Sequence, residues 1–281
     1  AIDTCGTGGD HAGTFNISTA SAIVAAGAGR PLGLCVAKHG NKSVTSNSGS
    51  SQVLDTLGVK LAVSTDTLTK CLDEAGICFC FAPAHHPAMK HAGPVRADLG
   101  FRTLFNLVGP LTNPAGAPRQ VMGVFGPQLT DMIAEVLLKL GSIHAMVVHG
   151  QMPDIDGAGA HQGGIDELST CGPTRVSTVR DGEVTTTDEL DPTDLGLSLG
   201  HPTALLADGP EQSAQIITDI LSGKDGPPRE IVALNAAAAL VVGGVAENLE
   251  DGLSMAFDAI DAGKAQAALA ALIELTNQDK S

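Results

Sequence analysis

Short apolar runs alternate along this chain with longer amphipathic or alanine-rich runs, and this alternation limits the possible fold more than any other feature. Five runs have the length and composition of strands, at residues 34–37, 77–81, 120–125, 145–148 and 175–179. Six others have the spacing of helices, at residues 20–28, 52–57, 66–74, 129–140, 213–221 and 230–242. Strands that alternate with helices pair through helical crossovers. The pattern predicts an α/β fold in which a large sheet is flanked by helices.

The segment from Cys5 to Thr19 indicates an anion-binding site. It contains the run Gly6-Thr7-Gly8-Gly9-Asp10, and glycine tolerates positive φ, so consecutive backbone N–H groups can turn toward one point. The run Asn16-Ile17-Ser18-Thr19 then opens a helix, for which Ser18 and Thr19 are natural N-cap residues. A helix N-terminus favours anions. The alternative is a plain strand-to-helix turn, because a lone G-x-G-G is a weak signal that matches neither common nucleotide fingerprint.

A second polar segment favours the anion site. The run Lys38-His39-Gly40-Asn41-Lys42-Ser43 follows the first predicted strand, and residues 45–51 add five hydroxyl side chains. Open α/β sheets bind ligands outside the carboxyl ends of their strands, where two such loops would meet. Residues 30–102 hold eight Lys and Arg against five Asp and Glu, whereas residues 103–281 hold eight against twenty-four. We therefore expect a pocket for a multiply charged anion; the alternative is a set of solvated, salt-bridged helix faces.

Composition argues against several classes of protein. A net charge of −15 is unfavourable for a nucleic-acid-binding surface. The longest apolar stretch, residues 231–246, is interrupted by Asn235 and is shorter than the ~20 residues of a membrane-spanning helix, so no membrane partner is expected. Six cysteines form no C-x-x-C pair, which favours reduced thiols in the cytoplasm over disulfides. The polar, glycine-rich residues 151–164 are predicted to form a mobile loop.

Further motifs follow the two polar segments in order along the chain. They are Ser48-Gly49-Ser50, Ala82-Pro83, His86-Pro87-Ala88-Met89-Lys90, Arg102-Thr103-Leu104-Phe105-Asn106, Gly109-Pro110-Leu111-Thr112-Asn113-Pro114, Asp166-Glu167-Leu168-Ser169 and Leu234-Asn235-Ala236. Together with the two polar segments, this set resembles the anthranilate phosphoribosyltransferases of tryptophan biosynthesis. The resemblance extends over nearly the whole chain.

The resemblance implies a two-domain enzyme. Residues 1–84 and 113–281 would form a large α/β domain that binds phosphoribosyl pyrophosphate, and residues 85–112 would belong to a small helical domain across the active-site cleft. Members of the family normally carry several helices before the glycine turn, which build most of the small domain and the contact of a homodimer. This sequence lacks those helices, so the small domain is expected to be a remnant, and the homodimer implied for the family is left open here.

The implied reaction transfers the phosphoribosyl group of phosphoribosyl pyrophosphate to the amine of anthranilate, giving N-(5-phosphoribosyl)anthranilate and pyrophosphate. The ribosyl centre becomes cationic while the leaving group carries several negative charges. Catalysis then needs electrostatic stabilisation and accurate placement of the nucleophile more than a strong base. Magnesium bound to the pyrophosphate is the implied cofactor.

The resemblance also gives roles to residues. Those expected to bind phosphoribosyl pyrophosphate are Gly6, Gly9, Asp10, Thr14, Asn16, Ile17, Ser18, Thr19, Lys38, His39, Gly40, Asn41, Lys42, Ser43, Val44, Thr45, Ser46 and Ser50. Those expected to bind anthranilate are Gly6, Asn41 and Arg96, whose guanidinium can hold a carboxylate through two N–H bonds. The expected Mg²⁺ ligands are Ser18, Asp166 and Glu167; taken without the resemblance, two adjacent acids are an ordinary start of a helix.

His39 is the implied catalytic residue, which would steer the amine or accept its proton. The alternative is a hydrogen-bonded loop histidine. His85 and His86 have no carboxylate or cysteine partner at ligand spacing, so they are expected to form a cap or a pocket wall rather than a metal site. Two other functions stay open at this point: a pyrimidine nucleoside phosphorylase of related fold, and a catalytically silent binding protein.

Overall fold

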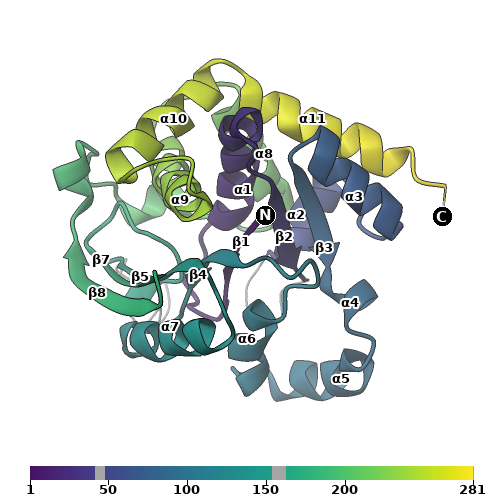
Figure 1. Cartoon of the computed structure of the whole chain (residues 1–281), viewed down its shortest axis with the longest axis horizontal. Coiled ribbons are helices and arrows are strands. Elements are labelled where there is room, and N and C mark those ends of the chain that lie inside the picture. The colour runs from purple at the N-terminus through teal and green to yellow at the C-terminus, as the bar shows by residue number, and fades with distance from the viewer. Residues whose placement is uncertain (42–47, 154–162, 281) are drawn as a thin grey trace.

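The computed structural model describes residues 1–41, 48–153 and 163–280. Within them, an eight-stranded sheet forms the centre of the molecule (Figure 1). Its strands are β1 (Ile2–Gly6), β2 (Val36–Gly40), β3 (Ile77–Phe81), β4 (Arg119–Gly123), β5 (His144–Gln151), β6 (Gly164–Ile165), β7 (Thr174–Arg180) and β8 (Glu183–Leu190). The order is β3-β2-β1-β4-β5-β7-β8, and β6 pairs with β5. The first five strands of this order are parallel, and β7 and β8 are antiparallel.

Helices cover both faces of the sheet, which confirms the predicted α/β fold (Figure 1). One face carries α1 (Ile17–Gly29), α9 (Pro227–Gly243), α10 (Leu249–Asp261) and α11 (Lys264–Asn277), and the other carries α7 (Thr130–Lys139). The remaining helices are α2 (Ser50–Thr56), α3 (Thr65–Glu74), α4 (Ala82–His85), α5 (Met89–Leu99), α6 (Leu104–Val108) and α8 (Pro210–Leu221). Among the described residues, no helix combines the length and hydropathy needed to cross a bilayer.

Helix α9 is the most deeply buried helix of the core. Every residue from Ile231 to Val242 is buried, as expected for a helix that is apolar on all sides. Its alanines pack against α1, which is also rich in alanine, and small side chains let the two helix backbones approach closely. The six cysteines are free thiols, in agreement with the sequence-based expectation.

Strand β2 corrects one predicted boundary. The strand begins at Val36 and runs to Gly40, so Lys38 and His39 are strand residues rather than loop residues. The physical reason is the neighbouring strand: β3 pairs with β2 along its length, from Val36↔Ile77 to Gly40↔Phe81, and this pairing keeps the polar segment extended.

Strand order explains where a ligand can bind. The chain passes from β1 outward to β2 and β3, and then returns to place β4 on the other side of β1. Connections from β1 and β4 therefore leave in opposite directions, which opens a crevice at their carboxyl ends. Helices α4, α5 and α6 follow β3 and lie past the carboxyl ends of the strands (Figure 1).

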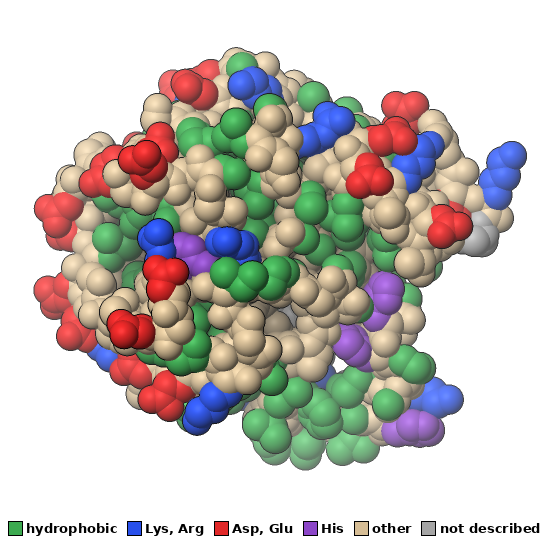
Figure 2. Space-filling model, in the orientation of Figure 1, with side chains coloured by type: hydrophobic (Ala, Val, Ile, Leu, Met, Phe, Trp, Pro, Cys, Tyr) green, Lys and Arg blue, Asp and Glu red, His purple; other side chains and the backbone are tan. Residues whose placement is uncertain are grey.

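This helical segment has an unusually apolar surface. Val95 is 57% exposed, Phe101 60% and Leu104 71%. Figure 2 shows hydrophobic side chains gathered over the part of the molecule that these helices occupy. Elsewhere in the described residues the large apolar side chains are mostly buried in two clusters, one on each face of the sheet.

Candidate active site

A cavity of about 1050 Å³ lies at the carboxyl ends of β1 and β2. Five parts of the chain form its walls: the loop after β1 with the start of α1, the end of β2 with the start of α2, the helical segment from α4 to Thr112, the residues after β6, and Ala207. The cavity therefore lies between the sheet and the helical segment, at the crevice that the strand order creates.

The glycine turn after β1 has the predicted backbone conformation. Gly8 and Gly9 have φ values of 63° and 76°, which side chains rarely permit. The N–H of Gly8 points into the site and donates to Oδ2 of Asp166 at 2.7 Å. The turn therefore presents an anion-binding donor, and in this structure the donor is bound to a carboxylate of the protein.

The start of α1 corrects the predicted cap. The helix begins at Ile17 and its N-cap residue is Asn16, not Ser18 or Thr19. The Ser18 N–H is instead satisfied from a distance, by Oε1 of Glu167 at 3.0 Å. Because a carboxylate takes this first-turn donor, no local hydroxyl is needed to cap it, and the helix can begin earlier.

Three carboxylates meet beside these donors. The Asp166 N–H donates to Oδ2 of Asp10 at 3.3 Å, and Asp10 also accepts from the N–H of Ala12. Burial, reinforced by Asp10 and Glu167, holds the pKa of Asp166 well above its usual range. Burial also raises the pKa of Glu167 to about 7, although the Lys38 ammonium and Ser18 oppose that shift. Crowded acids of this kind are stabilised by a nearby cation.

The oxygen donors of this cluster suit Mg²⁺. Magnesium prefers hard oxygen ligands and is commonly held by one or two carboxylates together with substrate phosphates and water. Within the described residues no group of three or more His, Cys, Asp or Glu could hold a metal by itself. Carboxylates of this cluster together with a bound phosphate would supply a ligand set of the kind that Mg²⁺ prefers.

Lys38 lines the cavity beside the carboxylate cluster but is almost fully buried. Its side chain is only 2% exposed, and Nζ donates to the carbonyl of Thr4 at 2.6 Å and to Oγ of Ser18 at 3.2 Å. Burial lowers the pKa of Lys38, while Asp3 and Glu167 oppose the change. Lys38 thereby orients the Ser18 hydroxyl and places a positive charge beside the carboxylates.

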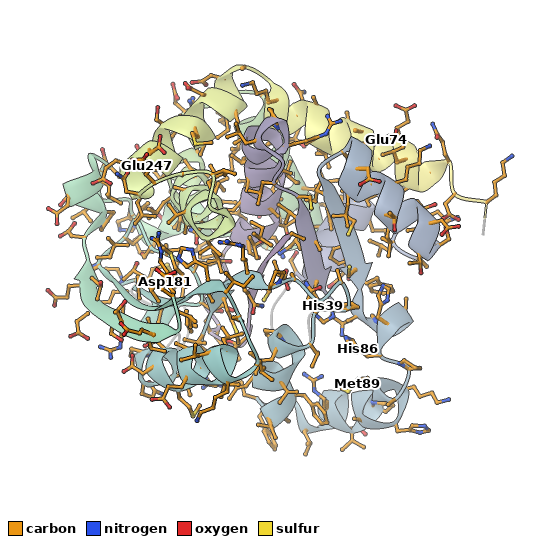
Figure 3. The ribbon with its side chains drawn as sticks, viewed as in Figure 1. His39, Glu74, His86, Met89, Asp181 and Glu247 are labelled. Atoms are coloured by element: carbon orange, nitrogen blue, oxygen red, sulfur yellow. The ribbon has the colours of Figure 1, made fainter. Side chains whose placement is uncertain are left out.

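His39 and His86 join the two sides of the cavity (Figure 3). Nε2 of His39, at the end of β2, lies 3.2 Å from Nε2 of His86, which caps α4. The backbone N–H of His39 donates to Oδ1 of the buried Asp3. Burial, together with His86 and His85, lowers the pKa of His39 to about 4, so its ring is neutral at pH 7. As expected, His86 forms a cap and a pocket wall.

The helical side of the cavity is largely apolar and carries two cationic side chains, Lys90 and Arg96. Ala82, Pro83, Met89 and Val108 line it, and Arg96 extends from α5 with its Cζ 5.4 Å from the ring centroid of Phe105. Such a wall suits a flat apolar ligand that carries an anionic group, since guanidinium binds carboxylate through paired N–H bonds.

Comparison with known proteins shows the family. Residues 1–266 match the family model described as glycosyl transferase family, a/b domain. The chain is 48% identical to the anthranilate phosphoribosyltransferase of Laribacter hongkongensis and 50% identical to that of Desulfosudis oleivorans, in each case over 99% of this chain and 76% or 78% of the relative. The chain belongs to the anthranilate phosphoribosyltransferase family.

Solved structures of the family have the same fold. The enzyme from Thermus thermophilus superposes with a TM-score of 0.85 at 39% identity, over 98% of this chain and 78% of the other. The anthranilate phosphoribosyltransferase of Saccharomyces cerevisiae in complex with PRPP and Mg superposes with a TM-score of 0.83 at 30% identity, over 99% and 74% of the two chains.

Most residues that the family resemblance singled out line the cavity. They are Gly6, Asp10, Thr14, Asn16, Ile17, Ser18, Lys38, His39, Gly40, Asn41, Ser50, Arg96, Asp166 and Glu167. Lys42, Ser43, Val44, Thr45 and Ser46 lie outside the described residues, as do residues 154–162 of the predicted mobile loop. Gly9 and Thr19 do not line the cavity, and the Thr19 side chain is fully buried. Thr19 is instead enclosed by the protein at the start of α1, away from the cavity.

Several lining residues had no predicted role. Phe105, Asn106 and Val108 of α6 contribute to the wall, and Nδ2 of Asn106 donates to the carbonyl of Thr7 in the glycine turn at 3.2 Å. Their signal in the sequence was the motif from Arg102 to Pro114, which carried the family resemblance without indicating which side chains face the ligand.

Proposed function

We propose that this chain transfers the phosphoribosyl group of phosphoribosyl pyrophosphate to the amine of anthranilate, in tryptophan biosynthesis. The observation that carries the proposal is a single cavity with two unlike sides. One side has anion donors and a carboxylate cluster, and the other has an apolar wall with Arg96. A polyanionic sugar phosphate and an aromatic carboxylate need these two environments next to each other.

On the phosphate side, backbone donors and small polar side chains bind and orient the substrate. The turn at Gly8, the start of α1 and the side chains of Thr14 and Asn16 face the cavity and supply N–H and hydroxyl groups. Ser18, Asp166 and Glu167 would hold Mg²⁺, consistent with their oxygen donors and raised pKa values. When bound, the metal neutralises charge on the departing pyrophosphate.

On the acceptor side, the cavity orients a weak nucleophile. Ala82, Pro83 and Met89 would contact the aromatic ring, Arg96 would bind its carboxylate, and Asn41 would hydrogen-bond the same substrate. A neutral His39 would accept a hydrogen bond from the amine. It would take the proton of that amine once the nitrogen becomes cationic, because a cationic nitrogen is acidic enough to protonate a base with a pKa of about 4. No residue becomes covalently attached.

The domain division follows the same cavity. We assign residues 1–84 and 113–281 to the large domain and residues 85–112 to the small one, with substrates between them. This division is supported by the position of α5 and α6, which lie past the carboxyl ends of the strands and form the wall of the cavity opposite the sheet. The homodimer implied by the family and the cytoplasmic location inferred from the cysteines stay predictions.

The proposal is tested by following anthranilate fluorescence with phosphoribosyl pyrophosphate and Mg²⁺. We expect turnover that requires Mg²⁺ and that falls by at least about 100-fold in an Asp166→Ala/Glu167→Ala double variant, the scale on which electrostatic stabilisation is lost. Turnover that persists without added metal or in the double variant would contradict the assigned metal site. Absence of turnover in the intact chain would contradict the proposed reaction.

A further inference from the structure

We propose that Asn235 is the positioning residue for the Asp166–Glu167 pair. The inference rests on the metal site proposed above and extends it to a residue that does not touch the cavity. Asn235 lies inside α9, is 3% exposed and is surrounded in sequence by apolar residues from Ile231 to Val242. Asparagine is a poor helix former and its amide is costly to bury, so its place in this helix requires specific partners.

Those partners belong to the residue that follows the acidic pair. Oδ1 of Asn235 accepts from the Leu168 N–H at 2.9 Å, and Nδ2 donates to the Leu168 carbonyl at 2.8 Å. The second Nδ2 proton goes to the carbonyl of Ile231 at 2.9 Å, within α9 itself. The side-chain amide thus pairs with both backbone groups of Leu168, as a neighbouring strand would, and fixes the chain directly after Glu167.

The sheet holds the same segment from the opposite side. A Cβ built on Gly123, at the end of β4, would overlap the backbone carbonyl of Asp166, and one on Gly150 would lie 2.6 Å from the carbonyl oxygen of Glu167. The backbone of the acidic pair therefore packs directly on two strand ends. With α9 behind it and the sheet beneath it, this backbone has little freedom, and its two carboxylates are directed toward Gly8 and Ser18.

The arrangement gives Asn235 a role in binding Mg²⁺ with substrate. Ligands of a metal are oriented by the groups that hydrogen-bond behind them, and loss of such a group typically weakens metal binding 10- to 100-fold. Here the Asn235 amide acts through the main chain of Leu168. Without it, the backbone of residues 166–168 can rotate, and the carboxylates of Asp166 and Glu167 are both displaced from the positions in which they would bind the metal. A purely structural asparagine would affect stability alone.

The test compares Asn235→Asp and Asn235→Ala with a matched control, Thr276→Val. The Asp variant keeps the size and the acceptor but loses the donor, whereas the Ala variant loses both. Thr276 is also a buried polar residue in a helix, where it donates to the Leu272 carbonyl, and α11 does not reach the cavity. Calorimetric titration of phosphoribosyl pyrophosphate in the presence of Mg²⁺ measures binding without turnover, and thermal unfolding measures stability.

We expect both Asn235 variants to bind the Mg²⁺ complex of phosphoribosyl pyrophosphate about 10- to 100-fold more weakly, with an unchanged KM for anthranilate. The Thr276→Val control should bind the Mg²⁺ complex like the unmodified chain, even if its Tm falls as far as that of the Asn235 variants. Folded Asn235 variants that bind like the unmodified chain would overturn the inference and leave the proposed function intact. An unmodified chain that does not bind the Mg²⁺ complex would overturn both.

A measurement on the unmodified chain covers the case in which neither variant folds. The pairing requires the Leu168 N–H to be protected from hydrogen exchange to the same extent as the core of α9. Exchange of that amide at the rate of an open loop would overturn the inference, and protection equal to that of α9 would support it.

Discussion

At the scale of single residues, the acceptor side of the cavity depends on Arg96. Its guanidinium lies among apolar lining residues of α5 and α6, and Lys cannot form the same planar pair of hydrogen bonds to a carboxylate. We predict that Arg96→Lys raises the KM for anthranilate by about 10-fold or more, since hydrogen bonds to charged groups are worth about 1.5–3 kcal/mol. The KM for phosphoribosyl pyrophosphate should not change.

Steady-state kinetics with each substrate varied in turn measure this effect. Arg180→Lys is the matched control, because Arg180 is a largely exposed residue at the end of β7, outside the cavity. Equal rises in both KM values for Arg96→Lys would show that Arg96 supports the cavity as a whole and does not bind anthranilate.

At the scale of elements, the ends of β4 and β5 need glycine, because a side chain there would displace the backbone of Asp166 and Glu167. We predict that Gly123→Ala destabilises the fold by about 1–3 kcal/mol, the usual range for overpacking, because its Cβ would overlap the Asp166 carbonyl. It should also weaken Mg²⁺-dependent substrate binding, since the carboxylates move with the main chain. Urea unfolding and calorimetry measure the two effects.

Gly209→Ala serves as the control for a glycine without such a contact. A Cβ at Gly209 would have its nearest neighbour, Oε2 of Glu211, at 3.5 Å, and Gly209 does not line the cavity. Its substrate binding should match that of the unmodified chain, although Ala at this N-cap position of α8 lowers the stability somewhat. Normal binding in a destabilised Gly123→Ala chain would contradict the coupling between strand ends and carboxylates.

The elements themselves show what local sequence patterns can predict. Strands β3 and β5 and helices α1, α3 and α9 followed from apolar runs and helical spacing, because burial dictates those patterns. Strand β8 was not predicted, because it is a polar edge strand in which almost every side chain is exposed. Helices α10 and α11 were not predicted either, although α11 has the same alanine-rich pattern as α1.

The site shows where local patterns stop. The glycine turn and the start of α1 indicated anion donors without help from any relative. The groups that bind those donors come from Asp166 and Glu167, 158 and 149 residues away along the chain, and no local pattern predicts such a contact. The family resemblance grouped Ser18 with Asp166 and Glu167 as metal ligands but did not indicate the bond from Gly8, and the contacts of Asn235 emerge only from the packing of α9.

At the scale of the whole molecule, buried histidines link stability to pH. Burial is the main cause that lowers the pKa of His144 to about 4. An unfolded histidine titrates near 6.5, so the unfolded chain binds the additional proton between about pH 6.5 and 4. The stabilising effect of a neutral His144 is therefore complete above about pH 6.5 and is lost as the pH falls toward 4.

We predict that His144→Gln flattens the loss of stability over this range. Denaturant unfolding at several pH values gives the free energy of unfolding of the variant and of the unmodified chain. The raised pKa of Glu167 changes stability with pH in the opposite direction, and this contribution cancels in the difference between the two chains. His201→Gln, at an exposed residue, is the control. An unchanged slope in His144→Gln would show that His144 does not contribute to acid sensitivity.

The central claim is that one cavity brings a sugar diphosphate and an aromatic amine together. The most direct test mixes the chain with phosphoribosyl pyrophosphate, anthranilate and Mg²⁺ and identifies the products by mass spectrometry. We predict N-(5-phosphoribosyl)anthranilate and pyrophosphate in equal amounts, each matching the anthranilate consumed. Release of pyrophosphate without the anthranilate adduct, or phosphorolysis of a pyrimidine nucleoside by the same preparation, would contradict this account.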